Sequence, residues 1–170
     1  RIQTILTFQV RHALLDQSDI TGNELRFPVG PGTGVDTKND KQLVLHIPTW
    51  FYRMLQIYAK SQRAKTRRER AIGGDCENQY LFLSIRGAPF FESKARSAHF
   101  DASNTLRHQK TGQAVRQFIT EKIIPLIRMK YEVPGFHYQF HDTRATAGMN
   151  WTDHQLLLVE QGKITLKEAR

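Results

Sequence analysis

The sequence has very little cysteine and no long hydrophobic run. Its single cysteine, Cys76, cannot close an internal disulfide, and no second Cys or His stands near it at the spacing of a zinc site. We find neither a charged-then-apolar leader nor an apolar run of about 18 residues. These absences argue against a disulfide-stabilised scaffold and a Cys-based zinc site, and they favour a cytoplasmic protein over an exported or membrane-spanning one.

The chain also has few acidic residues for its basic content. It contains 25 Lys and Arg against 16 Asp and Glu, which gives a formal net charge of +9. Such an excess favours an anionic partner, either nucleic acid or an acidic membrane surface, although a basic soluble protein without such a partner has the same composition. At 170 residues the chain is long enough to bury a core, and we expect one domain over residues 1–170.

The hydrophobic periodicity predicts a mostly α-helical domain of the α+β class. Apolar residues recur at helical spacing in several segments, and Pro125 is expected to kink one of them. Residues 80–83 are expected to form a brief strand, and the poorly patterned residues 93–110 a loop. Helices are expected over 2–10, 49–70, 113–131, 141–151, 153–160 and from 165 onward.

A small antiparallel β-hairpin sheet is expected in the first third of the chain. Residues 25–29 and 42–47 alternate between apolar and polar side chains, which is typical of half-buried strands. The polar segment 36–41 between them is expected to form the turn. The preceding segment 30–34 is rich in Gly and Pro, and it is not a Walker phosphate loop because no Gly-Lys-Ser/Thr follows it.

The sequence His141-Asp142-Thr143-Arg144 stands at the start of a predicted helix. Positions i and i+3 share one helix face, so His141 and Arg144 are expected to point the same way. A proton carrier beside a forked cation suits chemistry at a phosphate, although such a pair is also common on a solvated helix face.

The same region offers a weak metal pattern. His137 and His141 stand at i and i+4, but the zincin pattern requires Glu after the first His, and Tyr138 is there instead. We therefore expect no metal site and no cofactor.

Three further pieces of the sequence accompany this pair in a fixed order. Arg1 heads an amphipathic helix, Lys38 lies in the hairpin turn, and Arg144 continues into Ala145-Thr146-Ala147-Gly148. With these pieces in this order, the chain resembles the catalytic domain of the tyrosine recombinases, the phage integrase family. The resemblance extends over essentially all of the sequence and implies that family's helical catalytic core with its small hairpin sheet.

The resemblance implies a role for each of these residues. Arg1 and Arg144 would bind the scissile phosphate, Lys38 would protonate the leaving 5′-oxygen, and His141 would assist proton movement. Lys41 is the nearest alternative for the hairpin lysine, and Lys38 is preferred because it follows Thr37 at the start of the turn.

The chain departs from the family pattern most clearly after Arg144. Ala145 stands where many relatives have His, and Thr4 where many have Glu, but the larger departure is the lack of a Leu-Gly-His segment and of any tyrosine beyond Arg144. We therefore expect the chain to be part of a catalytic domain, ending before the nucleophilic tyrosine. None of its five tyrosines fits that position. They are Tyr52, Tyr58, Tyr80, Tyr131 and Tyr138.

Basic residues concentrate near the end of the long helix predicted after the hairpin. They are expected to follow the DNA backbone with little sequence preference, although a solvated basic helix end has the same pattern. The expected DNA-contacting residues are Lys41, Lys60, Arg63, Lys65, Arg67 and Arg68.

The resemblance implies site-specific DNA recombination or integration through a phosphotyrosyl intermediate. The implied partner is double-stranded DNA, bound by a tetramer of the intact protein in a bacterial or phage-type cytoplasm. Two alternatives stay open on the residues alone. One is a DNA-binding module without catalysis, and the other is a DNA strand transferase resembling type IB topoisomerases.

Overall fold

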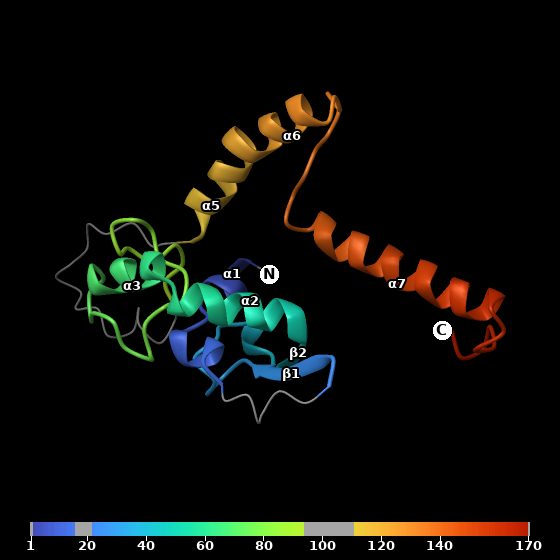
Figure 1. Cartoon of the computed structure of the whole chain (residues 1–170), viewed down its shortest axis with the longest axis horizontal. Coiled ribbons are helices and arrows are strands. Elements are labelled where there is room, and N and C mark those ends of the chain that lie inside the picture. The colour runs from blue at the N-terminus through green and yellow to red at the C-terminus, as the bar shows by residue number, and fades with distance from the viewer. Residues whose placement is uncertain (1, 16–21, 94–110, 170) are drawn as a thin grey trace. The chain divides into compact units, whose positions relative to one another are not determined.

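The computed structural model describes residues 2–15, 22–93 and 111–169 (Figure 1). The chain separates into two compact units, Arg1–Phe118 and Ile119–Arg170, and we describe each by itself. The sequence predicted one domain over residues 1–170. Helices together with one two-stranded sheet confirm the α+β class at this level. Arg1 and most of the expected loop 93–110 lie outside the described residues.

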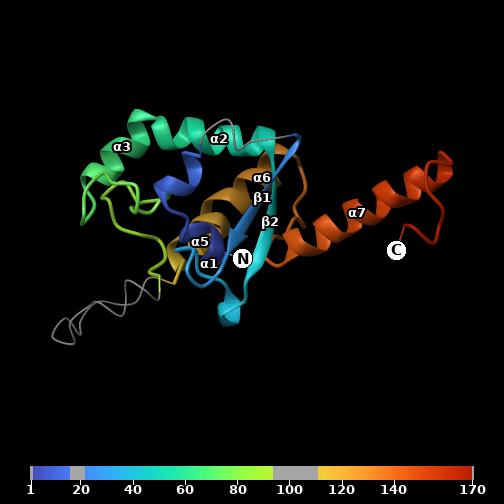
Figure 2. The ribbon, with the colours of Figure 1, turned by 90° about the horizontal axis from the view of Figure 1, so that it is seen from below.

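The expected hairpin is confirmed in the first unit. Strands β1 (Glu24–Val29) and β2 (Leu43–Pro48) pair antiparallel, with Leu25 opposite Ile47 and Val29 opposite Leu43 (Figure 2). Every second side chain of β1 is buried, as the period of two between apolar residues predicts. This register places the connection from residue 30 to 42 at one end of the sheet.

The N-terminal helix is shorter than its apolar spacing predicted. Helix α1 (Ile2–Leu6) is followed by the 3₁₀ turn η1 (Val10–Ala13). Between them the backbone pairs with a distant segment, since Leu81 N–H donates to the Phe8 carbonyl and Val10 N–H to the Gln79 carbonyl. Residues 80–83 form isolated bridges in place of the expected strand, from Tyr80 to Gln9 and from Leu83 to Pro89.

The single helix expected over 49–70 is divided at Ser61. Helix α2 (Thr49–Lys60) ends there because Ser61 has an extended backbone, with ψ of 146°. The Ser61 hydroxyl then accepts a hydrogen bond from Ala64 N–H at 3.2 Å and caps helix α3 (Gln62–Glu69). The prediction of one continuous helix was wrong because a serine inside a helical pattern can also begin a new helix.

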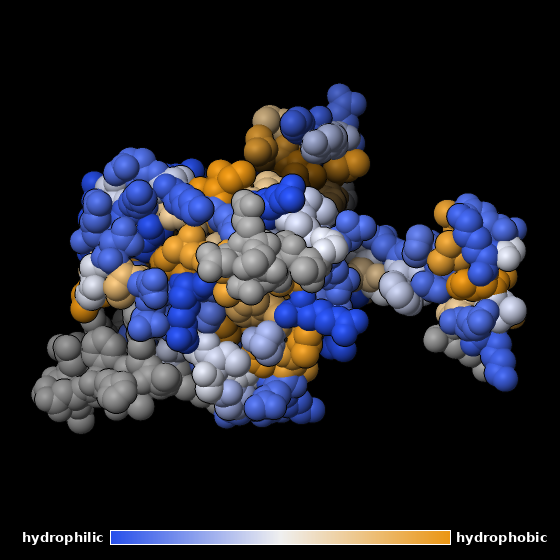
Figure 3. Space-filling model, turned by 60° about the horizontal axis from the view of Figure 1, so that its bottom comes forward, coloured by the Kyte–Doolittle hydropathy of each residue, from blue (hydrophilic) through white to orange (hydrophobic). Residues whose placement is uncertain are grey.

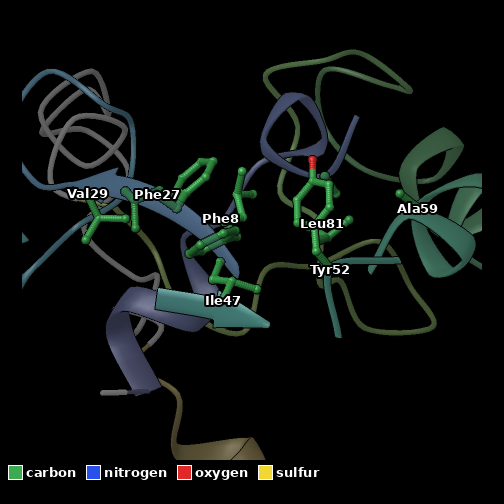
Figure 4. Packing of buried hydrophobic residues seen from close by; sticks show 10 residues of the cluster. Phe8, Phe27, Val29, Ile47, Tyr52, Ala59 and Leu81 are labelled. Carbon is green, nitrogen blue, oxygen red and sulfur yellow. The ribbon is translucent and has the colours of Figure 1, made fainter. Parts of the chain in front are cut away.

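The core of the first unit lies between the hairpin, the N-terminal segment and helix α2. Phe8 packs against Phe27 with ring centroids 5.4 Å apart, and Ile47 lies on the other side of Phe8 (Figure 4). Tyr52 of α2 is fully buried beyond them. Its hydroxyl donates to the His12 carbonyl at 3.0 Å and accepts from Leu15 N–H at 3.1 Å. The buried cluster comprises Phe8, Ala13, Leu25, Phe27, Val29, Val35, Ile47, Tyr52, Ala59 and Leu81.

The helix expected over 113–131 forms three consecutive segments. Helix α5 (Gln113–Phe118) is followed by the π-helical turn η5 (Ile119–Ile123) and by helix α6 (Ile124–Lys130). Pro125 stands at the start of α6 and has no N–H to donate to a carbonyl of the preceding turn. The expected disturbance at Pro125 therefore takes the form of a wider turn immediately before it.

Helix α7 (Asp142–Glu160) replaces the two short helices expected over 141–151 and 153–160. The Thr152 hydroxyl donates back to the Gly148 carbonyl at 3.0 Å, so it does not cap a new helix. Residues 165–169 form turns in place of the expected final helix.

Apolar side chains also reach the surface of the described chain, as the orange areas in Figure 3 show. On α7 they include Met149, Trp151, Leu156 and Leu157, and no residue of this helix is buried. None of the helices that the structure describes combines the length and the apolarity that a membrane crossing requires.

Replacing Tyr52 with Phe should destabilise the first unit by about 1–3 kcal/mol, because the Leu15 N–H and the buried His12 carbonyl would lose their partner. Urea denaturation monitored by circular dichroism would measure this. Tyr58→Phe is the matched control, since Tyr58 is only half-buried and its stacking on Phe82 is retained. Equal stability of the two variants would contradict the assignment.

Candidate functional site

The turn that carries Lys38 lies at the far end of the hairpin. Lys38–Asp40 form the short 3₁₀ turn η3, visible beyond the strand ends in Figure 2. Asn39 and Asp40 adopt positive φ angles of 59° and 52°, which Asn and Asp tolerate better than most residues. The local sequence is therefore suited to a tight change of direction immediately after Lys38.

The backbone on both sides of Lys38 is held by hydrogen bonds. Thr37 is 2% exposed, and its hydroxyl donates to the Lys41 carbonyl at 2.5 Å. Asp36 N–H donates to the Thr7 hydroxyl of the N-terminal segment at 2.9 Å. The side chains of Lys38 and Lys41 are exposed. The turn thus presents two ammonium groups to solvent from a fixed backbone.

The segment that precedes this turn is a compact loop centred on Thr33. The Thr33 hydroxyl donates to the Gly30 carbonyl at 2.7 Å and accepts from Val35 N–H at 3.2 Å. Gly30 has a φ of 128°, and a Cβ there would lie 2.8 Å from the Lys41 carbonyl oxygen. Only glycine allows this close approach of the two ends of the connection.

His141 and Arg144 lie at the beginning of helix α7 in the second unit. Arg144 N–H donates to the His141 carbonyl at 3.1 Å, and both side chains are exposed. The Asp142 carboxylate accepts from Gln139 N–H at 2.6 Å, which fixes the approach to the helix. A helix beginning at this motif is confirmed, and the i, i+3 spacing puts the two side chains on one side of its first turn.

The expected catalytic residues therefore fall into two groups, each with its own local geometry. Lys38 and Lys41 share the hairpin turn of the first unit, while His141 and Arg144 share one helical turn of the second. Arg1 lies outside the described residues. In the part of the chain that the structure describes, no three His, Cys, Asp or Glu side chains cluster as metal ligands.

The basic residues expected to contact DNA differ in their exposure to solvent and in the hydrogen bonds that they already make. Lys60, Arg63 and Lys65 are exposed on α2 and α3. Arg67 is half-buried, and one of its guanidinium nitrogens donates to the Leu83 carbonyl at 2.9 Å. It is therefore partly committed to holding the 80–83 segment.

Arg68 corrects the expected set of DNA contacts. It is 3% exposed, its Nε lies 2.5 Å from an Asp75 carboxylate oxygen, and its Nη1 donates to the Ala59 carbonyl at 2.9 Å. A guanidinium enclosed in this way joins α3 to its surroundings and does not face a phosphate. The partner of Arg68 is Asp75, which follows the Gly73-Gly74 turn and lies outside the basic run from which the DNA contact was predicted.

Comparisons with protein-family models, with curated proteins and with solved structures found no match to this chain.

Arg68→Ala should destabilise the first unit by roughly 2–3 kcal/mol, somewhat less than the loss of a fully enclosed ion pair because Asp75 keeps contact with water. Arg63→Ala, on the exposed side of the same helix, should change the free energy of unfolding by less than about 0.5 kcal/mol. Urea denaturation of both variants would test this. Similar stabilities would show that Arg68 is not structural.

Proposed function

We propose that this chain takes part in site-specific DNA recombination, supplying phosphate-contacting residues for strand cleavage and rejoining. The observation that carries the proposal is the Lys38 turn, in which an exposed ammonium group stands on a backbone held by Thr37 and Thr7. A proton donor must reach a leaving oxygen repeatedly in one geometry, and a fixed backbone reduces the freedom that it loses on doing so.

In the proposed reaction a tyrosine hydroxyl gives up its proton to His141 or to water, its oxygen attacks the scissile phosphorus, and the bond to the 5′-oxygen breaks. None of the five tyrosines of this chain is proposed for that role. Lys38 transfers a proton from Nζ to the departing 5′-oxygen. Without this proton the oxygen would have to depart as an alkoxide, which is a poor leaving group. The phosphotyrosyl bond retains the energy of the broken linkage, so a 5′-hydroxyl can reverse the step without a nucleotide cofactor.

The roles proposed for His141 and Arg144 follow from their chemistry and their exposure. Arg144 would hold two non-bridging phosphate oxygens with its planar fork, where negative charge increases in the transition state. His141 would pass a proton to or from the reacting oxygens, since an imidazole ring can both donate and accept one. An exposed position on the first turn of α7 leaves both side chains accessible to DNA.

Duplex binding is the part of the proposal that this chain should display alone. The exposed cations Lys60, Arg63 and Lys65 suit the DNA backbone, which is recognised by charge with little regard to sequence. Together with the net charge of +9, they support double-stranded DNA as the anionic partner.

Replacing Lys60, Arg63 and Lys65 with Ala should weaken duplex binding and lower the slope of log affinity against log salt by roughly 2–3, because three phosphate contacts are lost. Fluorescence anisotropy at several salt concentrations would measure both. The control is a triple Ala variant at Lys122, Lys163 and Lys167, which removes the same charge elsewhere. If both variants lose affinity equally, net charge and not this surface binds the DNA.

The chemical role of Lys38 can be tested in the protein extended downstream to include the nucleophile. Lys38→Ala should slow cleavage of a nicked duplex by about 10²–10⁴. A substrate with sulfur in place of the bridging 5′-oxygen should restore most of the rate, because a thiolate leaves without a proton. Lys41→Ala is the comparison on the same turn. Loss of a DNA contact at Lys41 should slow cleavage of both substrates equally, whereas rescue of Lys41→Ala by sulfur would make Lys41 the proton donor instead.

The readout is the covalent protein–DNA band on a denaturing gel. The chain of 170 residues should give no such band. An equal loss of rate for Lys38→Ala on both substrates would refute the proton-donor role. A band formed by the chain alone would assign the nucleophile to one of its own five tyrosines.

A further inference from the structure

Helix α3 carries a row of arginines, of which the proposed function uses only Arg63. Arg63, Arg67 and Arg70 stand at i, i+4 and i+7, and the helical backbone continues through Arg70 at the C-cap. This spacing places the three side chains on one face of the helix. Glu69, the only acid of α3, lies roughly 100° around the helix axis from Arg70. The row therefore carries positive charge along its whole length.

The segment that follows α3 returns alongside this row of arginines (Figure 1). One guanidinium nitrogen of Arg67 donates to the Leu83 carbonyl at 2.9 Å, and one of Arg70 donates to the Ile85 carbonyl at 3.0 Å. Each of these bonds uses one nitrogen of the guanidinium fork and leaves the others for a further acceptor. The two side chains thus hold residues 83–85 beside the helix face on which they stand.

A tight turn that begins at Ser84 brings in a fourth arginine. Ser84 N–H donates to the Ala88 carbonyl at 2.9 Å, and Gly87 N–H donates to the Ser84 carbonyl at 3.0 Å. The Ser84 hydroxyl accepts from Ala88 N–H at 3.0 Å. Arg86 stands in the middle of this turn, and its side chain is exposed. An exposed guanidinium group is therefore carried by a backbone with three internal hydrogen bonds.

Gly87 fixes this turn against the end of α3. It has a φ of 77°, and a Cβ there would lie 2.6 Å from the Arg70 carbonyl carbon and 2.6 Å from the Ala71 amide nitrogen. Only glycine allows the two backbones to approach so closely. Since Ile85 and Gly87 both lie against Arg70, Arg86 between them is held next to that residue.

No carboxylate pairs with these four guanidinium groups in the part of the chain that the structure describes. The ion pair of α3 found there joins Arg68, on the buried side of the helix, to Asp75. Neighbouring cations repel one another, and an anion bound between them removes that repulsion. A phosphate suits such a position, because guanidinium forks bind its oxygens in pairs.

We propose that Arg63, Arg70 and Arg86 form a guanidinium row that binds consecutive phosphates of one strand of duplex DNA. Arg67 holds the turn that carries Arg86. The inference rests on the proposed function, since it extends the duplex-binding surface of α2 and α3. From Arg63 to Arg70 the helix rises about 10 Å, and one strand carries a phosphate about every 3.4 Å of duplex axis, so the row can meet about three phosphates. Such contacts position a protein on DNA without reading its bases.

Arg86→Gln should weaken duplex binding by about fivefold and lower the slope of log affinity against log salt by about 1, because one phosphate contact is lost. Fluorescence anisotropy on two unrelated duplex sequences would measure this, and the loss should be the same on both. Arg26→Gln is the matched control, since it removes an exposed arginine of β1 in the same unit. Unchanged binding by Arg86→Gln, or an equal loss for Arg26→Gln, would overturn the proposal.

Gly87→Ala tests the placement of Arg86 without changing the charge of the protein. The added Cβ must push the turn away from Arg70, so affinity should fall by about as much as in Arg86→Gln. The double variant should bind no more weakly than Arg86→Gln alone, because the same contact is already lost. Urea denaturation would establish that each variant is folded. Additive losses in folded variants would contradict the role given to Gly87.

Chemical modification of the unaltered chain gives a test that does not depend on the stability of any variant. Phenylglyoxal reacts with exposed guanidinium groups, and digestion followed by mass spectrometry reports the extent of reaction at each arginine. Saturating duplex DNA should protect Arg70 and Arg86 and leave Arg26 reactive. If Arg86 reacts as readily with DNA as without it, the guanidinium row does not bind the duplex.

The same measurement distinguishes failure of the row from failure of the proposed function. In the extended protein, protection of Arg86 together with cleavage that does not need Lys38 would establish the row and remove Lys38 from the reaction. Cleavage that depends on Lys38, with Arg86 left unprotected, would do the reverse.

Discussion

The first unit depends on the hydrogen bonds made by one short segment, residues 2–13. From this segment Thr7 and His12 hold the hairpin connection, the Phe8 carbonyl pairs with Leu81, and the His12 carbonyl receives the Tyr52 hydroxyl. Three distant parts of the chain are thereby fixed to one another. A buried polar group without such a partner would lose solvation with no compensation, so these bonds define which arrangement of the apolar core is allowed.

Elements determined by local periodicity could be predicted from the sequence. The hairpin register follows from the alternation in β1, because a shift by one residue would expose Leu25 and Phe27. Helix ends were harder to predict. Ser61 interrupts a helical pattern through its own backbone angle and hydroxyl, whereas Thr152 bonds back into α7 and interrupts nothing.

For the candidate site, the exposure of its side chains could be predicted from the sequence. A lysine in a polar turn is exposed almost by default, and so is a His-Arg pair at the start of a helix with no buried residue. The anchoring of the turn could not be predicted, because Thr7 and Asp36 meet only after the chain has folded. For Arg68 the predicted exposure was wrong. It lies in a run of basic residues, but its guanidinium is buried against Asp75, which stands outside that run.

The division between a rigid backbone and solvent-exposed cations has a chemical consequence. Lysine carries its charge on a flexible side chain. If the loop before Lys38 were also flexible, the ammonium group would spend a smaller fraction of time in any one position. The hydrogen bonds of Thr33 and Thr37 remove the first of these contributions while leaving the ammonium group in water. In the proposed reaction, the loop hydrogen bonds would act only through the position of Lys38.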